Sequence, residues 1–521
     1  MTLPVHWPSV PALVVGALLV AAIAVAGRSE HKSPATRVRA SGAPSGGSGP
    51  VPRRMPTSRP AAAGARWARA AELHSLVTRG EEPGRLVLGT LAARGGRPTR
   101  RVLAAEPLQS LAVVGPTQSG KTTALAVPAI LGWSGPVVAA SVKTDLVRDT
   151  LAWRRRCGTV WCFDPARVTG LCSARWSPIP AARTWPGARR VANDLIEVAR
   201  GTGTTADGEF WYATAAKLLA PLFFAAATGG CSIADVVRWV DTQEVAEVAD
   251  ILEGAGVPEA LQAARASWQR DERQRSSVYT TAETVLEPFC EPPPDAGPDQ
   301  CDIDCEGLLT GANTLYLCAP AHDQRRLRGL FTAVVKQVLD AAFTRSARAG
   351  APLRPGLLVV LDEAANIASP DELDGLAATS ASHGIQLVTV FQDLAQVTAR
   401  YGPRASTVLN NHRAKMFLSG TADAGTLDQA SHLVGDEEVL VPSVTRGPGG
   451  PSTTSAQVQR RLLAPDALRR LPAGTGVLVY GALPPVHVAL RPWWADPVLA
   501  SRAATRSGRP ATPGLPGPAD P

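Results

Sequence analysis

The feature that most constrains the fold of this chain is a glycine-rich loop between an apolar run and a helix-like segment. Leu111–Val114 is apolar in the manner of a buried strand, and Gly115–Thr123 contains the pattern G-x-x-x-x-G-K-T. The glycines let backbone N–H groups wrap around phosphate oxygens, and the lysine adds a positive charge. A strand, such a loop and a helix in this order predict an α/β sheet with a nucleotide at its carboxyl edge.

The loop supplies most of the candidate binding residues. Lys121 can reach β- and γ-phosphate oxygens, and the Thr122 hydroxyl is a ligand for Mg²⁺. We therefore expect ATP and Mg²⁺ as cofactors. The predicted nucleotide-binding residues are Gly115, Pro116, Thr117, Gln118, Ser119, Gly120, Lys121, Thr122 and Thr123.

A second apolar run ends in an acidic pair. Leu357–Leu361 is followed by Asp362 and Glu363. In P-loop enzymes one acid stands on the metal side and another orients the attacking water, so we expect Asp362 to hold Mg²⁺ and Glu363 to act as general base. The alternative is that Asp362 and Glu363 are a solvated acidic pair at a strand end. The presence of the phosphate-binding loop at Gly115 favours the functional interpretation.

A third polar residue, Gln392, follows the strand-like run Ile385–Phe391. RecA-like ATPases carry a polar residue on the strand beside the acidic pair, where an amide can hydrogen-bond the γ-phosphate or the lytic water. A solvated glutamine at a strand end is the alternative. The expected catalytic residues are thus Lys121, Glu363 and Gln392.

Apolar runs alternate with helix-like segments over much of the chain. This alternation predicts a mostly parallel sheet with helices on both faces, as in a RecA-like P-loop core. The further strand-like runs are Val137–Val142, Thr159–Phe163, Thr314–Ala319 and Ala414–Leu418.

Residues 186–289 lie between the loop and the acidic pair and show helical periodicity with little strand signal. We expect them to form an all-helical insertion domain that divides the ATPase domain into residues 66–185 and 290–500. The expected helices are Ala188–Ala199, Phe210–Ala227, Ile233–Val240, Val245–Leu252, Ala260–Gln274 and Val278–Leu286.

An uncharged apolar segment, Val10–Gly27, lies near the N-terminus. Its 18 residues would span about 27 Å as a helix, enough for the hydrocarbon core of a membrane. No Lys or Arg precedes Arg28, which disfavours a cleaved signal peptide, and a buried core helix is a further alternative. Because the basic excess follows the segment, we expect residues 1–27 to be a single-pass anchor with the C-terminal domains in the cytoplasm.

Residues 28–65 are rich in Ser, Gly, Pro and Arg and are typical of a flexible tether. The stretch from Arg28 to Arg66 holds eight basic residues and one acid, which is +7 of the net charge of +8. The rest of the chain is therefore nearly neutral, and its charge does not indicate DNA binding. Residues 501–521 have a similar composition and are expected to be a disordered tail.

Eight segments, taken in order between about Arg66 and Trp494, resemble the TraG/TraD-like coupling proteins of type IV secretion systems. They are GRLVLG (Gly84–Gly89), GPTQSGKTT (Gly115–Thr123), SVKTDL (Ser141–Leu146), FDP (Phe163–Pro165), TLYLCAP (Thr314–Pro320), LDEAANI (Leu361–Ile367), FQDLAQV (Phe391–Val397) and LLAPDALRRLP (Leu462–Pro472). The stretch from the acidic pair to Gln392 resembles the family's TraM recognition region.

The resemblance implies a membrane-anchored, hexameric ATPase that moves DNA toward a type IV secretion channel. The DNA is usually a single strand with a covalently attached relaxase, and a relaxosome protein is the implied partner. The resemblance also implies that Lys121 and Thr122 bind nucleotide and Mg²⁺, that Asp362 and Glu363 support hydrolysis, and that Gln392 is the sensor.

Two features depart from the family pattern. Many relatives have two transmembrane helices, whereas Val10–Gly27 is the only candidate here. Relatives often carry an arginine before the sensor strand that reaches a neighbour's ATP, and Thr379–Gly384 contains none. Arg325, Arg326 and Arg328 are candidate substitutes for this arginine. The alternative is that they are salt-bridged or solvated residues at the start of a helix.

Lys143, in the segment SVKTDL, has two interpretations: it either contacts phosphate or merely ends a strand.

Two other functions remain open from the sequence. An FtsK-like chromosomal DNA translocase would be expected to carry a C-terminal winged-helix domain, and no such pattern follows Trp494. A nucleotide-gated scaffold that docks secreted proteins would fit the nearly neutral core and the missing arginine. Stimulation of ATP turnover by DNA separates the scaffold from a DNA motor.

Overall fold

The computed structural model describes residues 64–80, 82–200, 206–290, 302–367, 372–447 and 450–504. The predicted anchor at Val10–Gly27 and the predicted tether up to residue 63 lie outside these residues, as does the chain after residue 504. Helix α16 (Pro497–Ala503) ends inside the segment expected to be disordered, so regular structure continues past residue 500.

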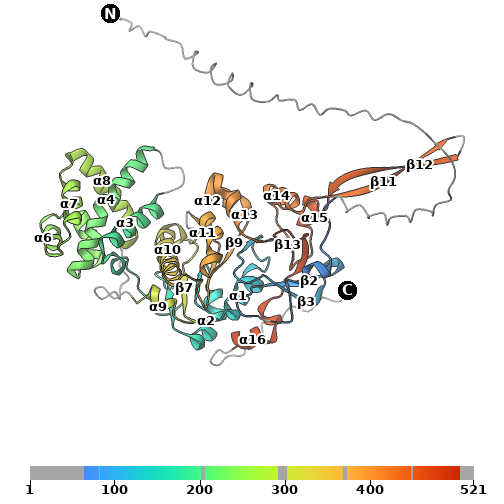
Figure 1. Cartoon of the computed structure of the whole chain (residues 1–521), viewed down its shortest axis with the longest axis horizontal. Helices are drawn as coiled ribbons and strands as arrows, with labels where there is room; N and C mark the ends of the chain where they lie inside the picture. Colours follow the sequence, from blue (N-terminus) through green and yellow to red (C-terminus); the bar gives the residue numbers. More distant parts are fainter. Residues whose placement is uncertain are drawn as a thin grey trace, which may run out of the picture. The chain divides into compact units, whose positions relative to one another are not determined.

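A twelve-stranded sheet runs through the described part of the chain in the order β1-β3-β2-β14-β13-β10-β4-β9-β8-β5-β7-β6 (Figure 1). Neighbouring strands from β10 to β6 are parallel, as the alternation of strands and helices predicts. The strands are β1 (Val77–Thr78), β2 (Val87–Ala92), β3 (Pro98–Ala104), β4 (Leu111–Val114), β5 (Val137–Ser141), β6 (Val160–Phe163), β7 (Thr314–Cys318), β8 (Leu357–Asp362), β9 (Ile385–Phe391), β10 (Ala414–Leu418), β13 (Thr475–Tyr480) and β14 (Val486–Ala489).

The other end of the sheet is antiparallel, which the alternation of strands and helices does not predict. Strand β10 pairs with β13 in antiparallel register, and β14, β2, β3 and β1 continue in the same manner. These strands come from both ends of the described chain, so their pairing joins segments that lie almost 400 residues apart, such as Thr90 and Ala489.

Helices cover both faces of the sheet. Because successive strand residues point to opposite faces, each strand contributes side chains to two cores. Ala112 and Val114 of β4 belong to the core on the face of α10, whereas Leu111 and Val113 belong to the core on the face of α1. The helices of this part are α1 (Val127–Gly132), α2 (Asp145–Cys157), α9 (Cys305–Leu308), α10 (Gln324–Ala349), α11 (Leu373–Thr379), α12 (Leu394–Tyr401), α13 (Ala405–Asn411), α14 (Ala424–Val434) and α15 (Pro465–Arg469).

The regular elements described between β6 and α9 are all helices, and they share a hydrophobic core. Their central helix, α4, is the one described helix long and apolar enough to cross a membrane, but 67% of that window is buried, as in a core helix. The helices are α3 (Trp185–Ala199), α4 (Ala206–Gly229), α5 (Ile233–Asp241), α6 (Ala246–Gly254), α7 (Pro258–Trp268) and α8 (Glu272–Leu286).

The single helix expected over Ala260–Gln274 is wrong. Helix α7 ends at Trp268, and α8 begins at Glu272. The physical reason is a cap: the Asp271 carboxylate accepts a hydrogen bond from the backbone N–H of Gln274 at 3.1 Å. This bond satisfies an end group of a new helix and competes with continuation of the old one.

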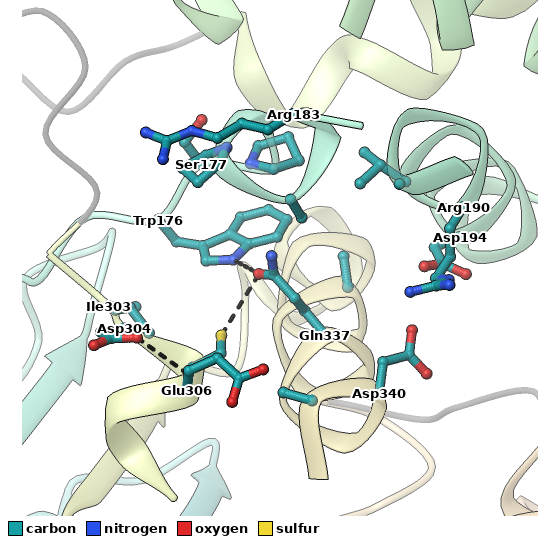
Figure 2. Close-up of a pocket in the computed structure, with 18 of the residues that line it drawn as sticks. Trp176, Ser177, Arg183, Arg190, Asp194, Ile303, Asp304, Glu306, Gln337 and Asp340 are labelled. Carbon is teal, nitrogen blue, oxygen red and sulfur yellow. Dashed lines mark hydrogen bonds between the residues drawn. The ribbon is translucent and has the colours of Figure 1, made fainter. Parts of the chain in front are cut away.

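The helical segment meets the sheet-bearing part along α10. The ammonium of Lys336 lies 3.0 Å from a carboxylate oxygen of Asp194 on α3 and also pairs with Glu197. A pocket of about 820 Å³ lies beside this contact, and Figure 2 shows the indole N–H of Trp176 directed at the Gln337 oxygen, 2.5 Å away. No residue of the phosphate-binding loop lines this pocket.

A long hairpin forms a separate two-stranded sheet. The strand-like runs identified in the sequence do not include it. It consists of β11 (Asp436–Gly447) and β12 (Gly450–Arg461), and Figure 1 shows the two strands side by side. At its base, Arg460 pairs with Glu437 at 2.8 Å and Arg461 with Asp436 at 3.1 Å.

A buried arginine on α2 forms hydrogen bonds with the chain after α1 and with β7. The Arg154 side chain is 0% exposed and donates to the carbonyl oxygens of Trp133 and Gly135 at 2.6 and 2.8 Å. Its Nε donates to the Thr314 hydroxyl at 2.7 Å. The guanidinium therefore joins α2 to the chain after α1 and to the start of β7.

We expect Arg154→Met to lower the free energy of unfolding by about 3 kcal/mol or more, because several buried acceptors lose their donor. Urea unfolding of the two proteins measures the difference. Arg155→Met is the matched control, since Arg155 is exposed on the same helix and should change stability by less than about 0.5 kcal/mol. Equal effects of the two substitutions would contradict the structural role of Arg154.

Candidate functional site

The three predicted site elements lie on adjacent strands. Strand β9 lies between β4 and β8 in the sheet. The loop after β4, Asp362 at the end of β8 and Gln392 after β9 therefore share the carboxyl edge. The backbone N–H of Gly115 donates to the Phe391 carbonyl at 3.2 Å, which ties the start of the loop to the end of β9. The structure thus brings together the groups that the sequence singled out.

The conformation of the loop explains its glycines. Gly120 has a φ of +90°, which a side chain would strain, and Gln118 has a φ of +62°. A Cβ on Gly115 would lie only 2.7 Å from the Cβ of Leu418 in the neighbouring strand β10. Gly115 is therefore needed for close packing against β10, and Gly120 for the turn into the helix.

Lys121 is a buried charge in the centre of the loop. Its side chain is 7% exposed, and its ammonium donates to the carbonyl oxygens of Gly115 and Pro116 at 2.5 and 2.6 Å. Burial lowers the pKa of Lys121, and the negative charges of Asp362 and Glu363 oppose this shift. Carbonyl groups satisfy the N–H donors without neutralising the charge, so the loop is suited to an anion.

Thr122 and Asp362 form the candidate metal site. The Thr122 hydroxyl donates to the Asp362 carboxylate at 2.9 Å. Asp362 is 4% exposed, and burial raises its pKa to about 6. A hydroxyl and a carboxylate are hard oxygen ligands, and Mg²⁺ typically takes one or two such groups together with phosphate oxygens and water. The donor set therefore fits Mg²⁺.

Glu363 and Gln392 are in direct contact. The Gln392 amide nitrogen donates to the Glu363 carboxylate at 3.3 Å. Glu363 has a φ of +67°, a left-handed conformation that costs a residue other than glycine roughly 1–2 kcal/mol. Two backbone hydrogen bonds hold this geometry: Ala364 N–H donates to the Val390 carbonyl at 3.0 Å, and Asn366 N–H donates to the Glu363 carbonyl at 2.8 Å. No sequence pattern reveals this backbone conformation.

The predicted arginines lie further along the same edge. Helix α10 begins after β7, which is separated from β8 by β5. Arg326 forms an ion pair with Asp323 at 3.8 Å, as the salt-bridged alternative predicts. Arg328 lines a pocket of about 190 Å³ together with Glu197 of α3. The Arg325 side chain is outside the described part of the structure.

The parallel core, the glycine-rich loop and the facing acidic and amide side chains define a P-loop protein with a RecA-like core. Residues 73–513 match the family model described as type IV secretory system conjugative DNA transfer. This match covers most of the 521 residues, and the chain belongs to that family.

The similar proteins agree with this assignment. The conjugal transfer protein TraG of Escherichia coli is 26% identical over 442 residues, covering 75% of this chain and 68% of that protein. Protein VirD4 of Agrobacterium fabrum is 23% identical over 414 residues, covering 74% of this chain and 59% of that protein.

Solved structures show the same fold. The bacterial conjugative coupling protein TrwBdeltaN70, in its unbound monoclinic form, superposes with a TM-score of 0.62 at 20% identity, over 82% of this chain and 92% of that one. The plasmid coupling protein TrwB in complex with ADP and Mg²⁺ gives a TM-score of 0.56 at 19% identity, over 82% and 94% of the two chains.

The left-handed conformation of Glu363 yields a stability prediction. We expect Glu363→Gly to be more stable than Glu363→Ala by about 1 kcal/mol, because both variants lose the carboxylate but alanine retains the strain of a Cβ. Urea unfolding of the two variants measures the difference. At Asp428, exposed within α14, the order should reverse, since glycine is the poorer helix former. A more stable alanine at Glu363 would show that the position is not strained.

Proposed function

We propose that this chain is an ATP hydrolase that drives conjugative DNA transfer. The observation that carries the proposal is the convergence at one sheet edge of a buried lysine, a hydroxyl–carboxylate pair and a glutamate held by an amide. Family membership supplies the DNA-transfer role. ATP and Mg²⁺ are the proposed cofactors, and structures of TrwB with an ATP analogue and with ADP and Mg²⁺ support them.

Each side chain has a distinct proposed role. Lys121 would exchange its carbonyl partners for phosphate oxygens, which neutralise its charge. Thr122 and Asp362 would hold Mg²⁺, which when bound withdraws negative charge from the phosphate oxygens. Glu363 would accept a proton from the attacking water.

Gln392 is the residue that we propose reports the state of that proton acceptor. Its amide contacts Glu363, and the residue before it, Phe391, accepts the hydrogen bond from the Gly115 backbone. A change at the terminal phosphate would therefore reach β9 through two contacts. This supports the role of sensor for Gln392.

The finer parts of the proposal concern assembly and partners. We place the chain in the cell membrane, anchored once by Val10–Gly27, with the ATPase domain in the cytoplasm and residues 186–289 as an inserted helical domain. The proposed partners are DNA with an attached relaxase, a relaxosome protein, the type IV secretion channel and further copies of this chain in a hexamer. The family description, type IV secretory system conjugative DNA transfer, supports the DNA and secretion partners.

ATP turnover by the purified full-length chain, with and without single- and double-stranded DNA, tests the proposal. We expect turnover that rises with DNA. Lys121→Ala should abolish nucleotide binding and turnover, whereas Glu363→Gln should bind nucleotide and lose turnover by at least about a hundredfold, because it lacks the general base.

Lys217→Ala is the control, since Lys217 is exposed on α4, outside the site. Turnover that persists in Lys121→Ala would refute the assignment of this site. ATP binding without any response to DNA would instead favour a nucleotide-gated docking scaffold.

The arginine proposal has its own test. If one of Arg325, Arg326 and Arg328 reaches a neighbour's ATP, its alanine variant should lower turnover by roughly a thousandfold while leaving nucleotide binding intact. Mixing that variant with Lys121→Ala subunits, whose arginine is intact, should restore part of the activity. Arg345→Ala, further along α10, is the control. Unchanged turnover in all three single variants would remove these residues as candidates.

A further inference from the structure

The loop after β5 carries a lysine that the site described above does not use. Strands β5 and β8 are paired in parallel with Ala140 beside Leu361, and Ser141 and Asp362 are the next residues of these two neighbouring strands. The buried Ser141 hydroxyl oxygen accepts a hydrogen bond from the backbone N–H of Lys143 at 3.1 Å. This bond fixes the turn by which Lys143 leaves the sheet next to Asp362.

The ammonium of Lys143 has no counterion within the described ranges. Its side chain is exposed, and no described residue forms a hydrogen bond or an ion pair with its ammonium. The positive charge of Lys143 also lies close enough to the buried Lys121 ammonium to repel it.

The sheet order places the two lysines on opposite sides of the site. Lys121 follows β4 and Lys143 follows β5, while β9 with Gln392 and β8 with Asp362 lie between them. Two positive charges near one site repel each other, and an anion bound between them would stabilise both. A lysine ammonium is a compact charge with three rotatable donors, which suits a terminal phosphate.

We propose that Lys143 binds the terminal phosphate of a nucleoside triphosphate and so makes the site prefer the triphosphate to the diphosphate. The inference rests on the proposed nucleotide-binding function. The two lysines would then have different roles. Lys121, inside the loop, would bind both the diphosphate and the triphosphate. Lys143, which follows β5, would bind only the terminal phosphate, which the diphosphate lacks.

Equilibrium binding of ADP and of the non-hydrolysable analogue ADPNP to the full-length chain, in the presence of Mg²⁺, tests this inference. We expect Lys143→Met to weaken ADPNP binding about tenfold, the effect of losing one charge-assisted hydrogen bond, and to change ADP binding less than about twofold. Lys143→Arg keeps the charge and should recover most of the ADPNP affinity. Lys217→Met, an exposed lysine on α4, should leave both affinities unchanged.

The possible outcomes separate this inference from the function on which it rests. Equal weakening of both nucleotides by Lys143→Met, or no weakening of either, would overturn the role of Lys143. If Lys121→Ala abolishes binding of both nucleotides while Lys143→Met has no effect, the nucleotide site stands and Lys143 merely ends a strand. If the unmodified chain binds neither nucleotide, both proposals fail.

Discussion

The architecture of the site depends on the burial of one charge, the ammonium of Lys121, in a residue that is only 7% exposed. Burying a charge is costly unless fixed dipoles or opposite charges surround it. The carbonyl dipoles of Gly115 and Pro116 and the acids at the end of β8 surround this one. These groups stay in place because β4, β9 and β8 are buried on both faces, each within two hydrophobic cores.

Helix α10 joins this core to the helical segment. It begins after β7, at the edge that carries the site, and Lys336 further along pairs with Asp194 and Glu197 of α3. A rigid helix in contact with both parts is a physical route by which a change at the sheet edge can reach the helical segment.

The sequence predicts the parts of this structure that depend on local patterns. Apolar runs of strand length locate β4, β8 and β9. The loop motif locates Lys121 after β4, because the close approach of Gly115 to β10 and the positive φ of Gly120 both require glycine. The antiparallel end of the sheet is missed because it joins Thr90 to Ala489, and no local signal encodes such a pairing. The division of α7 from α8 is missed because one cap at Asp271 outweighs helical periodicity. The left-handed turn at Glu363 is missed because tertiary contacts impose it on a residue that does not favour it.

That last position carries a consequence for the redesign of this chain. A sequence chosen only to maximise folding stability would place glycine at residue 363, since a Cβ is unfavourable there. Consensus and stability-guided design commonly trade activity for stability at such strained positions. Under the proposed function Glu363 is the general base, so it is the residue to hold fixed when the stability of the protein is raised by redesign.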